Sequence, residues 1–162
     1  MPVPARRVLA FVDGSRGSDE VVAAAQELAT PSDARVTLVA VAVIEDERPG
    51  CCDLRSGVWN RMQRELAAEQ LRTAEARIGS GVRPRRAIVE GTSVEQSLVD
   101  ESRSGGYDLI VVANERRSRW PWRSCLADRL RARVDCEVVT PEDRRRQGAP
   151  EPVSLSPSGG SD

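Results

Sequence analysis

The sequence of 162 residues contains no histidine and no lysine. The missing histidine removes the side chain that most often serves as general base, pH switch and metal ligand. Every basic side chain is an arginine, and the formal net charge is only −1. This balance excludes a global electrostatic attraction to nucleic acid or to membranes.

Cysteine pairs with metal-binding spacing are also missing. The four cysteines are Cys51, Cys52, Cys125 and Cys136, and no Cys-x-x-Cys motif occurs among them. Zinc sites need ligands at characteristic short spacings, so the sequence predicts no metal site. The adjacent Cys51 and Cys52 leave two interpretations open, a redox-sensitive spot or two thiols without a role, and we favour the second.

Long apolar runs are absent as well. No segment reaches the roughly 20 apolar residues of a membrane-spanning helix, and the N-terminus has no signal-peptide core. We therefore expect a cytoplasmic protein with reduced thiols and no membrane partner. Since the chain also has no nucleophile elbow and no P-loop, we expect no catalytic residues and no enzyme activity.

The sequence does contain a regular alternation of apolar strands and amphipathic helices. Apolar, β-branched runs predict strands at residues 7–12, 36–44, 86–89, 108–113 and 136–140. Helical periodicity predicts helices at residues 18–29, 58–78, 92–104 and 122–134. Such alternation is typical of an α/β domain with a parallel sheet and helices on both faces.

Local signals refine these elements and the limits of the domain. Ser18 is expected to cap the first helix, and Thr92–Glu95 has the spacing of a capping box for the third. The domain is predicted to cover residues 5–142, between an arm at residues 1–4 and a disordered polar tail at residues 143–162. The second helix carries one apolar stripe: Val58, Met62, Leu66, Leu71, Ala74 and Ile78.

Three blocks of the chain resemble the universal stress protein family. They are Val8–Ser15, Ala34–Val41 and Gly91–Val139, and together they span roughly residues 5–142. The resemblance implies a single-domain, Rossmann-like fold of the adenine nucleotide alpha hydrolase-like type, with a five-stranded parallel sheet in the order 3-2-1-4-5. It also implies a homodimer paired through the last strand, at residues 137–140, and, in one branch of the family, bound ATP.

In that branch the resemblance places particular residues near the nucleotide. Asp13, followed by Gly14 and Ser15, stands where the family has an aspartate after the first strand. Val41 maps to the backbone that contacts adenine. The phosphate loop of the family has the pattern Gly-x2-Gly-x9-Gly-Ser/Thr. It aligns with a segment that contributes Ala113, Asn114, Arg116, Arg117, Ser124 and Cys125.

This loop departs from the family pattern at its defining positions. Ala113 and Arg116 stand at the first two glycines, Ser124 and Cys125 at the final pair, and the spacing is two residues shorter. A phosphate cradle needs backbone amides that approach the anion closely, often at positive φ, and side chains prevent this. The sequence therefore predicts no cofactor, and ATP or another adenine nucleotide stays an alternative.

Each unusual feature of this edge has two interpretations. Asp13 could contact a nucleotide or magnesium, or could cap its own turn, which we favour. Arg116 and Arg117 could bind an anion with their guanidinium groups, or could be solvated surface, which we favour. The segment Trp120–Trp122 could stack on nucleic-acid bases, or could pack over the sheet edge, which we favour.

These choices lead to one functional hypothesis and two rivals. The leading hypothesis is a regulatory or stress-response module that acts through an unknown protein partner. The first rival is a sensor of a nucleotide or small anion, with a phosphate site rebuilt from arginines. The second is a nucleic-acid binder that uses the loop of tryptophans and arginines, and its binding would weaken steeply with salt.

Overall fold

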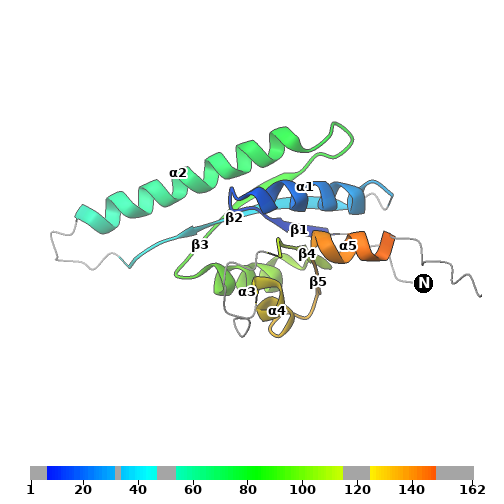
Figure 1. The fold of residues 1–162 in the computed structure, drawn as a ribbon. Helices are drawn as coiled ribbons and strands as arrows, with labels where there is room; N and C mark the ends of the chain where they lie inside the picture. The colour runs from blue at the N-terminus through cyan, green and yellow to red at the C-terminus, as the bar shows by residue number, and fades with distance from the viewer. Residues whose placement is uncertain (1–6, 32–33, 47–53, 115–124, 149–162) are drawn as a thin grey trace, which may run out of the picture.

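The structure is a computed structural model, and it describes residues 7–31, 34–46, 54–114 and 125–148. Strands and helices alternate along these residues (Figure 1). The strands are β1 Arg7–Phe11, β2 Arg35–Val43, β3 Arg85–Gly91, β4 Leu109–Val111 and β5 Glu137–Val139. The helices are α1 Arg16–Ala29, α2 Leu54–Arg77, α3 Val94–Gly105, α4 Leu126–Arg131 and α5 Pro141–Gly148.

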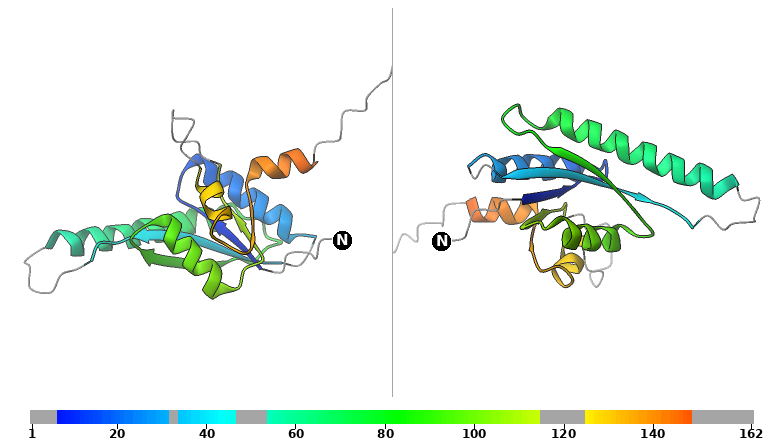
Figure 2. Two further views of the ribbon diagram at one scale, coloured as in Figure 1. Left: turned by 90° about the horizontal axis from the view of Figure 1, so that it is seen from below. Right: turned by 180° about the vertical axis from the view of Figure 1, so that it is seen from behind.

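The strands form a single parallel sheet in the order β3-β2-β1-β4-β5. This is the sheet, and the strand order, that the family resemblance implied, so the predicted fold is confirmed. Helices α1 and α2 cover one face, and α3 and α4 cover the other (Figure 2). Helix α5 lies next to α1, and an ion pair of 3.1 Å joins Arg145 to Glu20.

Two cores lie on the two faces of the sheet, because neighbouring side chains of a strand point to opposite sides. Val8 and Leu38 are fully buried on the side of α1 and α2. Leu9 and Val39 are fully buried on the side of α3 and α4. Burial on both faces explains why the strands read as continuous apolar runs in the sequence.

The helix caps differ from the predicted ones in two places. Helix α1 begins after Ser15, so Ser18 lies in the first turn and does not cap it. Helix α3 is capped by Ser93, whose hydroxyl accepts a hydrogen bond from the Gln96 N–H at 3.2 Å, so the cap lies one residue later than predicted. The end of α3 is as predicted, since Gly106 adopts a left-handed φ of 60°.

The C-terminal boundary of the ordered domain also differs. Residues 143–148, which the sequence analysis assigned to the disordered tail, belong to α5. A reciprocal cap stabilises this helix: the Thr140 N–H donates to Asp143 Oδ2 at 3.0 Å, and the Asp143 N–H donates to Thr140 Oγ1 at 3.3 Å. Pro141 occupies a first-turn position that proline favours. The segment was misassigned because its charged composition outweighed this capping signal.

The other boundaries shift by a few residues. Helix α4 ends at Arg131, three residues before the predicted end, because the Arg133 N–H bonds to the Leu130 carbonyl and tightens the last turn. Strands β4 and β5 are shorter than predicted, whereas β3 is longer. Of the helices in the described ranges, none has the length and apolar character needed to cross a membrane.

The apolar stripe predicted on α2 divides into two parts. Leu71 and Ala74 are buried in the core, as expected. Val58, Met62 and Leu66 are exposed over 54%, 57% and 52% of their surfaces. The first half of α2 extends past the start of α1, so α1 covers only the second half (Figure 1). The prediction of a continuous core-facing stripe is therefore wrong for the first half of α2.

Candidate functional site

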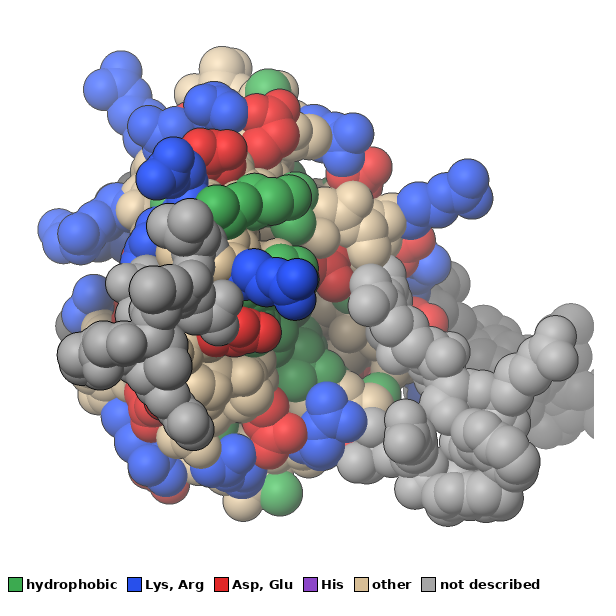
Figure 3. Space-filling view, turned by 90° about the vertical axis from the view of Figure 1, so that its left-hand side faces the viewer, with side chains coloured by type: hydrophobic (Ala, Val, Ile, Leu, Met, Phe, Trp, Pro, Cys, Tyr) green, Lys and Arg blue, Asp and Glu red, His purple; other side chains and the backbone are tan. Residues whose placement is uncertain are grey.

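The candidate site lies at the carboxyl edge of the sheet, which Figure 3 shows face on. Open parallel sheets bind ligands at this edge, where the strand order reverses. The reversal here lies between β1 and β4, so the segments after β1, β2 and β4 all reach the site. Hydrophobic side chains gather in the middle of this face, between charged ones (Figure 3).

Asp13 follows β1 and bonds within its own turn. Its Oδ1 accepts hydrogen bonds from the Ser15 N–H and from the Ser18 hydroxyl, both at 3.0 Å. The Asp13 N–H donates to the Ser18 Oγ, also at 3.0 Å. The carboxylate therefore stabilises the start of α1. The Ser15 hydroxyl is buried and has no hydrogen-bond partner among the described residues.

Gly14 allows this turn to approach α2. Its φ is +76°, a left-handed conformation that side chains disfavour. The Gln70 side chain of α2 lies against it and donates from Nε2 to the Asp13 carbonyl at 2.8 Å. A Cβ at position 14 would lie 3.1 Å from the Gln70 Cγ. Helix α2 is thereby joined to the turn that carries Asp13.

We expect Gly14→Ala to lower the free energy of unfolding by about 1–2 kcal/mol, because alanine is strained in the left-handed region. The contact with Gln70 adds to this loss. Urea denaturation followed by circular dichroism measures the change. Gly81→Ala is the control, since its Cβ would meet nothing within 4 Å. Equal losses from the two variants would contradict the assignment of strain to Gly14.

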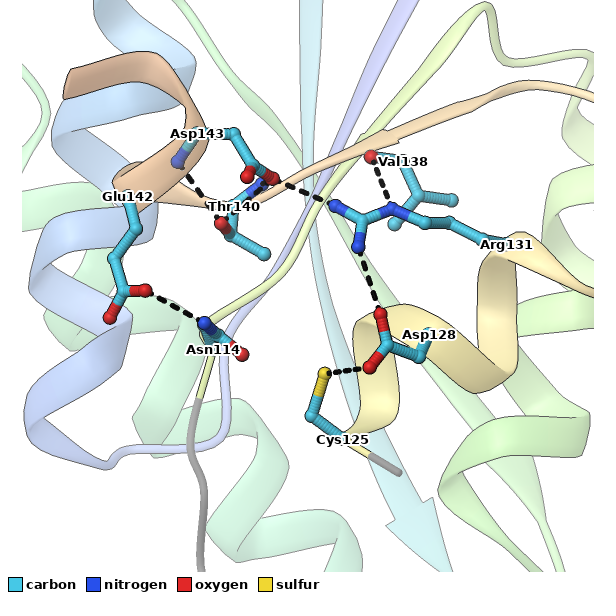
Figure 4. Close-up of polar contacts among 8 residues, drawn as sticks. All are labelled: Asn114, Cys125, Asp128, Arg131, Val138, Thr140, Glu142 and Asp143. Atoms are coloured by element: carbon cyan, nitrogen blue, oxygen red, sulfur yellow. Dashed lines mark hydrogen bonds and ion pairs between the residues drawn. The ribbon is translucent and has the colours of Figure 1, made fainter. Parts of the chain in front are cut away.

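Val41, Ala113 and Asn114 also lie near this edge. Val41 packs against the core under α3 and α4, whereas Ala113 packs against the opposite core. The Asn114 side chain donates from Nδ2 to Glu142 of α5 at 2.8 Å (Figure 4). Asn114 therefore connects the end of β4 to α5.

Cys125 precedes α4 and belongs to a polar network between α4, β5 and α5 (Figure 4). Its thiol donates to Asp128 Oδ2 at 3.1 Å. The Arg131 guanidinium pairs with Asp128 Oδ1 at 3.0 Å and with Asp143 Oδ2 at 2.7 Å. Its Nε donates to the Val138 carbonyl at 3.2 Å. The Asp128 carboxylate thus lies at the start of α4.

The network changes the proton affinity of Asp143. Burial acts to raise the pKa of this carboxyl, but hydrogen bonds from Thr140 and the charge of Arg131 outweigh it and lower the pKa below the ordinary 3.8. The stabilisation is therefore complete above that ordinary value and is lost as pH falls through the lowered pKa of the folded state.

Asp143→Asn is accordingly expected to cost about 1 kcal/mol of unfolding free energy at neutral pH, the usual effect of a lost cap. The difference from the wild type should shrink as the pH falls below the ordinary 3.8 and through the lowered pKa of Asp143, where the wild-type carboxyl also becomes neutral. Urea titrations over a pH series measure it. Asp135→Asn, at an exposed residue after α4, is the control. A loss that does not change with pH would contradict the linkage.

Several predicted site residues lie outside the described residues. They are Arg116, Arg117 and Ser124, together with the Trp120–Trp122 segment and the Cys51–Cys52 pair. The anion-binding and base-stacking interpretations of this loop therefore stay predictions.

Two residues that the sequence analysis did not identify help to shape this edge. Asn60 is only 2% exposed, and its side chain bonds to both backbone groups of Glu45: Oδ1 accepts from the N–H at 2.8 Å and Nδ2 donates to the carbonyl at 2.9 Å. Trp59 donates from Nε1 to the Val43 carbonyl at 3.2 Å. The start of α2 is therefore fixed to the segment after β2. Asn60 lies seven residues before the buried Ala67, and this helical spacing is the signal that could have identified it.

The sequence model of the universal stress protein family matches residues 4–140. The chain belongs to that family. Its predicted membership is thereby confirmed, and the universal stress domain covers most of the chain.

Solved structures agree with this assignment. A universal stress family protein from Burkholderia pseudomallei is 28% identical, over 83% of this chain and 94% of that chain, with a TM-score of 0.65. UspA from Lactobacillus plantarum is 15% identical over 83% and 95%, with a TM-score of 0.69. The Archaeoglobus fulgidus universal stress protein in complex with dAMP is 15% identical over 83% and 94%, with a TM-score of 0.61. None of the curated proteins compared with the chain matches it.

The described acidic and thiol side chains of the universal stress domain do not form a cluster that could hold a metal ion. Within the described ranges, no group of three or more cysteines, aspartates and glutamates could hold a metal ion. Asp13, Asp128 and Asp143 bond to helix starts and to Arg131. These carboxylates therefore organise the carboxyl edge of the sheet.

Proposed function

We propose that this universal stress domain is a non-catalytic stress-response regulator that acts through a protein partner and does not hold ATP in the usual way of its family. The observation that carries the proposal is the Asp128 carboxylate at the start of α4, bonded to the Cys125 thiol and paired with Arg131. In the resemblance, the phosphate loop ends at Cys125. A phosphate at that position would have to displace the Asp128 carboxylate from the Cys125 thiol and from Arg131.

The other described positions of the expected nucleotide site support this proposal. The Asp13 carboxylate is engaged by Ser15 and Ser18, so a ligand would have to compete with those bonds. Asn114, after β4, is bonded to Glu142. The segment between Ala113 and Cys125 contains no glycine, so its backbone cannot readily form an anion cradle at positive φ.

A thermal-shift panel tests the proposal. The purified protein is heated with ATP, ADP, AMP or cyclic AMP, each with and without magnesium. A ligand at 100 times its dissociation constant would stabilise the fold by about 2.7 kcal/mol, which is readily seen. We expect no shift with millimolar ATP. The Archaeoglobus fulgidus protein with dAMP is the positive control for the assay. A shift with ATP that Asp13→Ala abolishes would overturn the proposal.

A sensor of adenine mononucleotides is the second candidate. The Ser15 hydroxyl, which is buried and has no partner among the described residues, lies at the start of α1, where it could accept or donate a bond to a ligand. A relative of the same fold holds dAMP. In the same panel, this candidate predicts a shift with AMP, weakened in Ser15→Ala and absent with ATP. No shift with either nucleotide would exclude it.

We also propose a homodimer formed through β5, the edge strand of the sheet. Glu137 and Val139 bond to β4, through Glu137 N to Asp108 O at 3.3 Å and Val112 N to Val139 O at 3.2 Å. The backbone groups of Val138 therefore point away from β4 and are available to a second strand. Its carbonyl accepts a bond from Arg131, which strand pairing would replace.

Val138→Pro is expected to convert such a dimer to a monomer in size-exclusion chromatography with light scattering. Proline removes the outward N–H of Val138 but none of the bonds to β4. Val138→Ala is the matched control, because it shortens the side chain and keeps the N–H. It should stay dimeric. A monomeric wild type, or a dimer that survives in both variants, would contradict pairing through β5.

A further inference from the structure

A pocket lies at the amino edge of the sheet, the end opposite to the candidate site. It has a volume of about 250 Å³, smaller than the pockets that hold drug-sized ligands. The amino-terminal parts of β1, β2 and β3 meet the last turn of α3 there. Its lining includes Arg7, Thr37, Arg85, Glu101, Ser104 and Tyr107.

Three arginines on neighbouring strands face this side of the sheet. Arg7 of β1 is in register with Arg35 of β2, and Arg85 of β3 is in register with Thr37. Residues in register point to the same face, and Thr37 and Arg7 share the face of Leu9. None of the three guanidinium groups forms an ion pair with a described residue. Like charges this close repel one another, so an anion would be attracted to this edge.

Arg86, the residue after Arg85, differs from it in having an acidic partner. Arg86 of β3 points to the other face of the sheet, where it pairs with Glu75 of α2 at 3.3 Å. Alternation along β3 thus gives one arginine an acidic partner and leaves Arg85 facing the pocket. The acidic partner is present only on the face that α2 covers.

The negative charge in the pocket does not cancel the three arginines. Glu101 contributes one carboxylate in the lining, and the C-terminal end of α3 contributes roughly half a negative charge. Asp108, whose Oδ2 accepts from the Arg7 N–H at 2.9 Å, contributes a second carboxylate beside the pocket. The Tyr107 hydroxyl donates to Glu101 Oε1 at 3.1 Å. The field in the pocket therefore remains positive, and the carboxylate is already held by a neutral donor.

The polar wall of the pocket is fixed. Tyr107 and Thr37 are only 9% and 7% exposed. Burial raises the pKa of Tyr107, so its hydroxyl stays protonated. The Arg7 guanidinium lies 5.4 Å from the centre of the Tyr107 ring. An anion would therefore bind beside a wall that is already ordered, with the guanidinium groups as its donors, which lowers the cost of binding.

We propose that this pocket binds a compact phosphate, free or as a monoester, between the guanidinium groups of Arg7 and Arg85. Guanidinium forms paired hydrogen bonds to phosphate oxygens. The Ser104 hydroxyl lies at the rim, where it donates to the Glu101 carbonyl at 3.3 Å and can accept a bond from a monoester. Arg35, on the same face outside the lining, adds to the positive field. Glu101 can accept a hydrogen bond from a hydroxyl group of a monoester. This site is independent of the function proposed for the carboxyl edge.

Tyr107 provides a specific probe, because it is the single tyrosine of the whole chain. Full-length protein that contains 3-fluorotyrosine gives one fluorine resonance, which reports on this pocket. The protein is titrated with inorganic phosphate, with glycerol phosphate, and with sodium chloride at matched ionic strength. We expect a saturable change of the resonance with the phosphates and none with chloride.

Variants decide whether the site is the one proposed. Arg85→Gln should weaken phosphate binding roughly tenfold or more, since a hydrogen bond to a charged group is lost. Arg72→Gln, an equal charge change on the exposed side of α2, should leave binding unchanged. Tighter binding of glycerol phosphate would identify a monoester as the ligand, and equal binding would identify free phosphate.

Three results would overturn the proposal. One is a response to chloride as large as the response to phosphate. Another is phosphate binding that Arg85→Gln leaves intact. The third is loss of the response in Asp13→Ala, because it would place the phosphate at the carboxyl edge. Failure of the nucleotide panel has no bearing on these outcomes, so the two proposals can fail separately.

Discussion

Replacing Leu9 by alanine is expected to lower the free energy of unfolding by about 2–5 kcal/mol. Leu9 lies in β1, the central strand of the sheet, and it is fully buried in the core under α3 and α4. The smaller side chain loses its transfer free energy and leaves a cavity that the packed neighbours cannot fill. Urea denaturation with an unchanged m-value measures the loss.

Leu66→Ala is the matched control, because the chemical change is the same and the environment differs. Leu66 is 52% exposed on the first half of α2. Its replacement should change the free energy of unfolding by about 0.5 kcal/mol or less. If Leu66→Ala lowers the free energy of unfolding as much as Leu9→Ala does, the first half of α2 is covered in solution. That result would contradict the exposure of Leu66 in the isolated chain.

Asn60→Ala is expected to lower the free energy of unfolding by about 2 kcal/mol or more. The variant removes both hydrogen bonds to the Glu45 backbone, and each such bond contributes about 1 kcal/mol net. The start of α2 also loses its attachment to the segment after β2. Thermal or urea unfolding of the purified variant measures the loss.

Asn114→Ala controls for the removal of an amide side chain. Asn114 makes one exposed hydrogen bond, to Glu142, so its loss should cost about 0.5 kcal/mol or less. Hydrogen exchange adds a second readout, since Asn60→Ala should speed exchange in the first turns of α2 and leave α3 unchanged. Equal exchange in both variants and the wild type would show that Asn60 does not hold α2 in place.

The order of elements and their packing could be predicted because they depend on local pattern. Runs such as Val8–Val12 and Val36–Ile44 are almost continuously apolar. This pattern is typical of a strand that is buried on both faces of a parallel sheet. The resemblance then supplied the strand order. The left-handed residue at the end of α3 was predictable from Gly105–Gly106, since glycine adopts that conformation without strain.

The arrangement of side chains at the site could be predicted only in part. Asp13 was identified as a turn residue or a ligand contact, but its bonds to Ser15 and Ser18 depend on how β1 leads into α1. The partnership of Arg131 with Asp143 joins two helices across β5, and no short spacing in the sequence indicates it. Helical periodicity placed Met62 in the core because periodicity does not show whether a second helix reaches that far.

The sequence by itself determined the α/β class and the family, because both are written in residue types at fixed positions, and it predicted a phosphate loop that departs from the family pattern. The tertiary structure alone decided which charges meet. It set Asp128 at the start of α4, joined α5 to the domain, and gathered Arg7, Arg35 and Arg85 on one face. The physical reason is that electrostatic contacts depend on distance in space, and residues far apart in sequence become neighbours only when the sheet is formed.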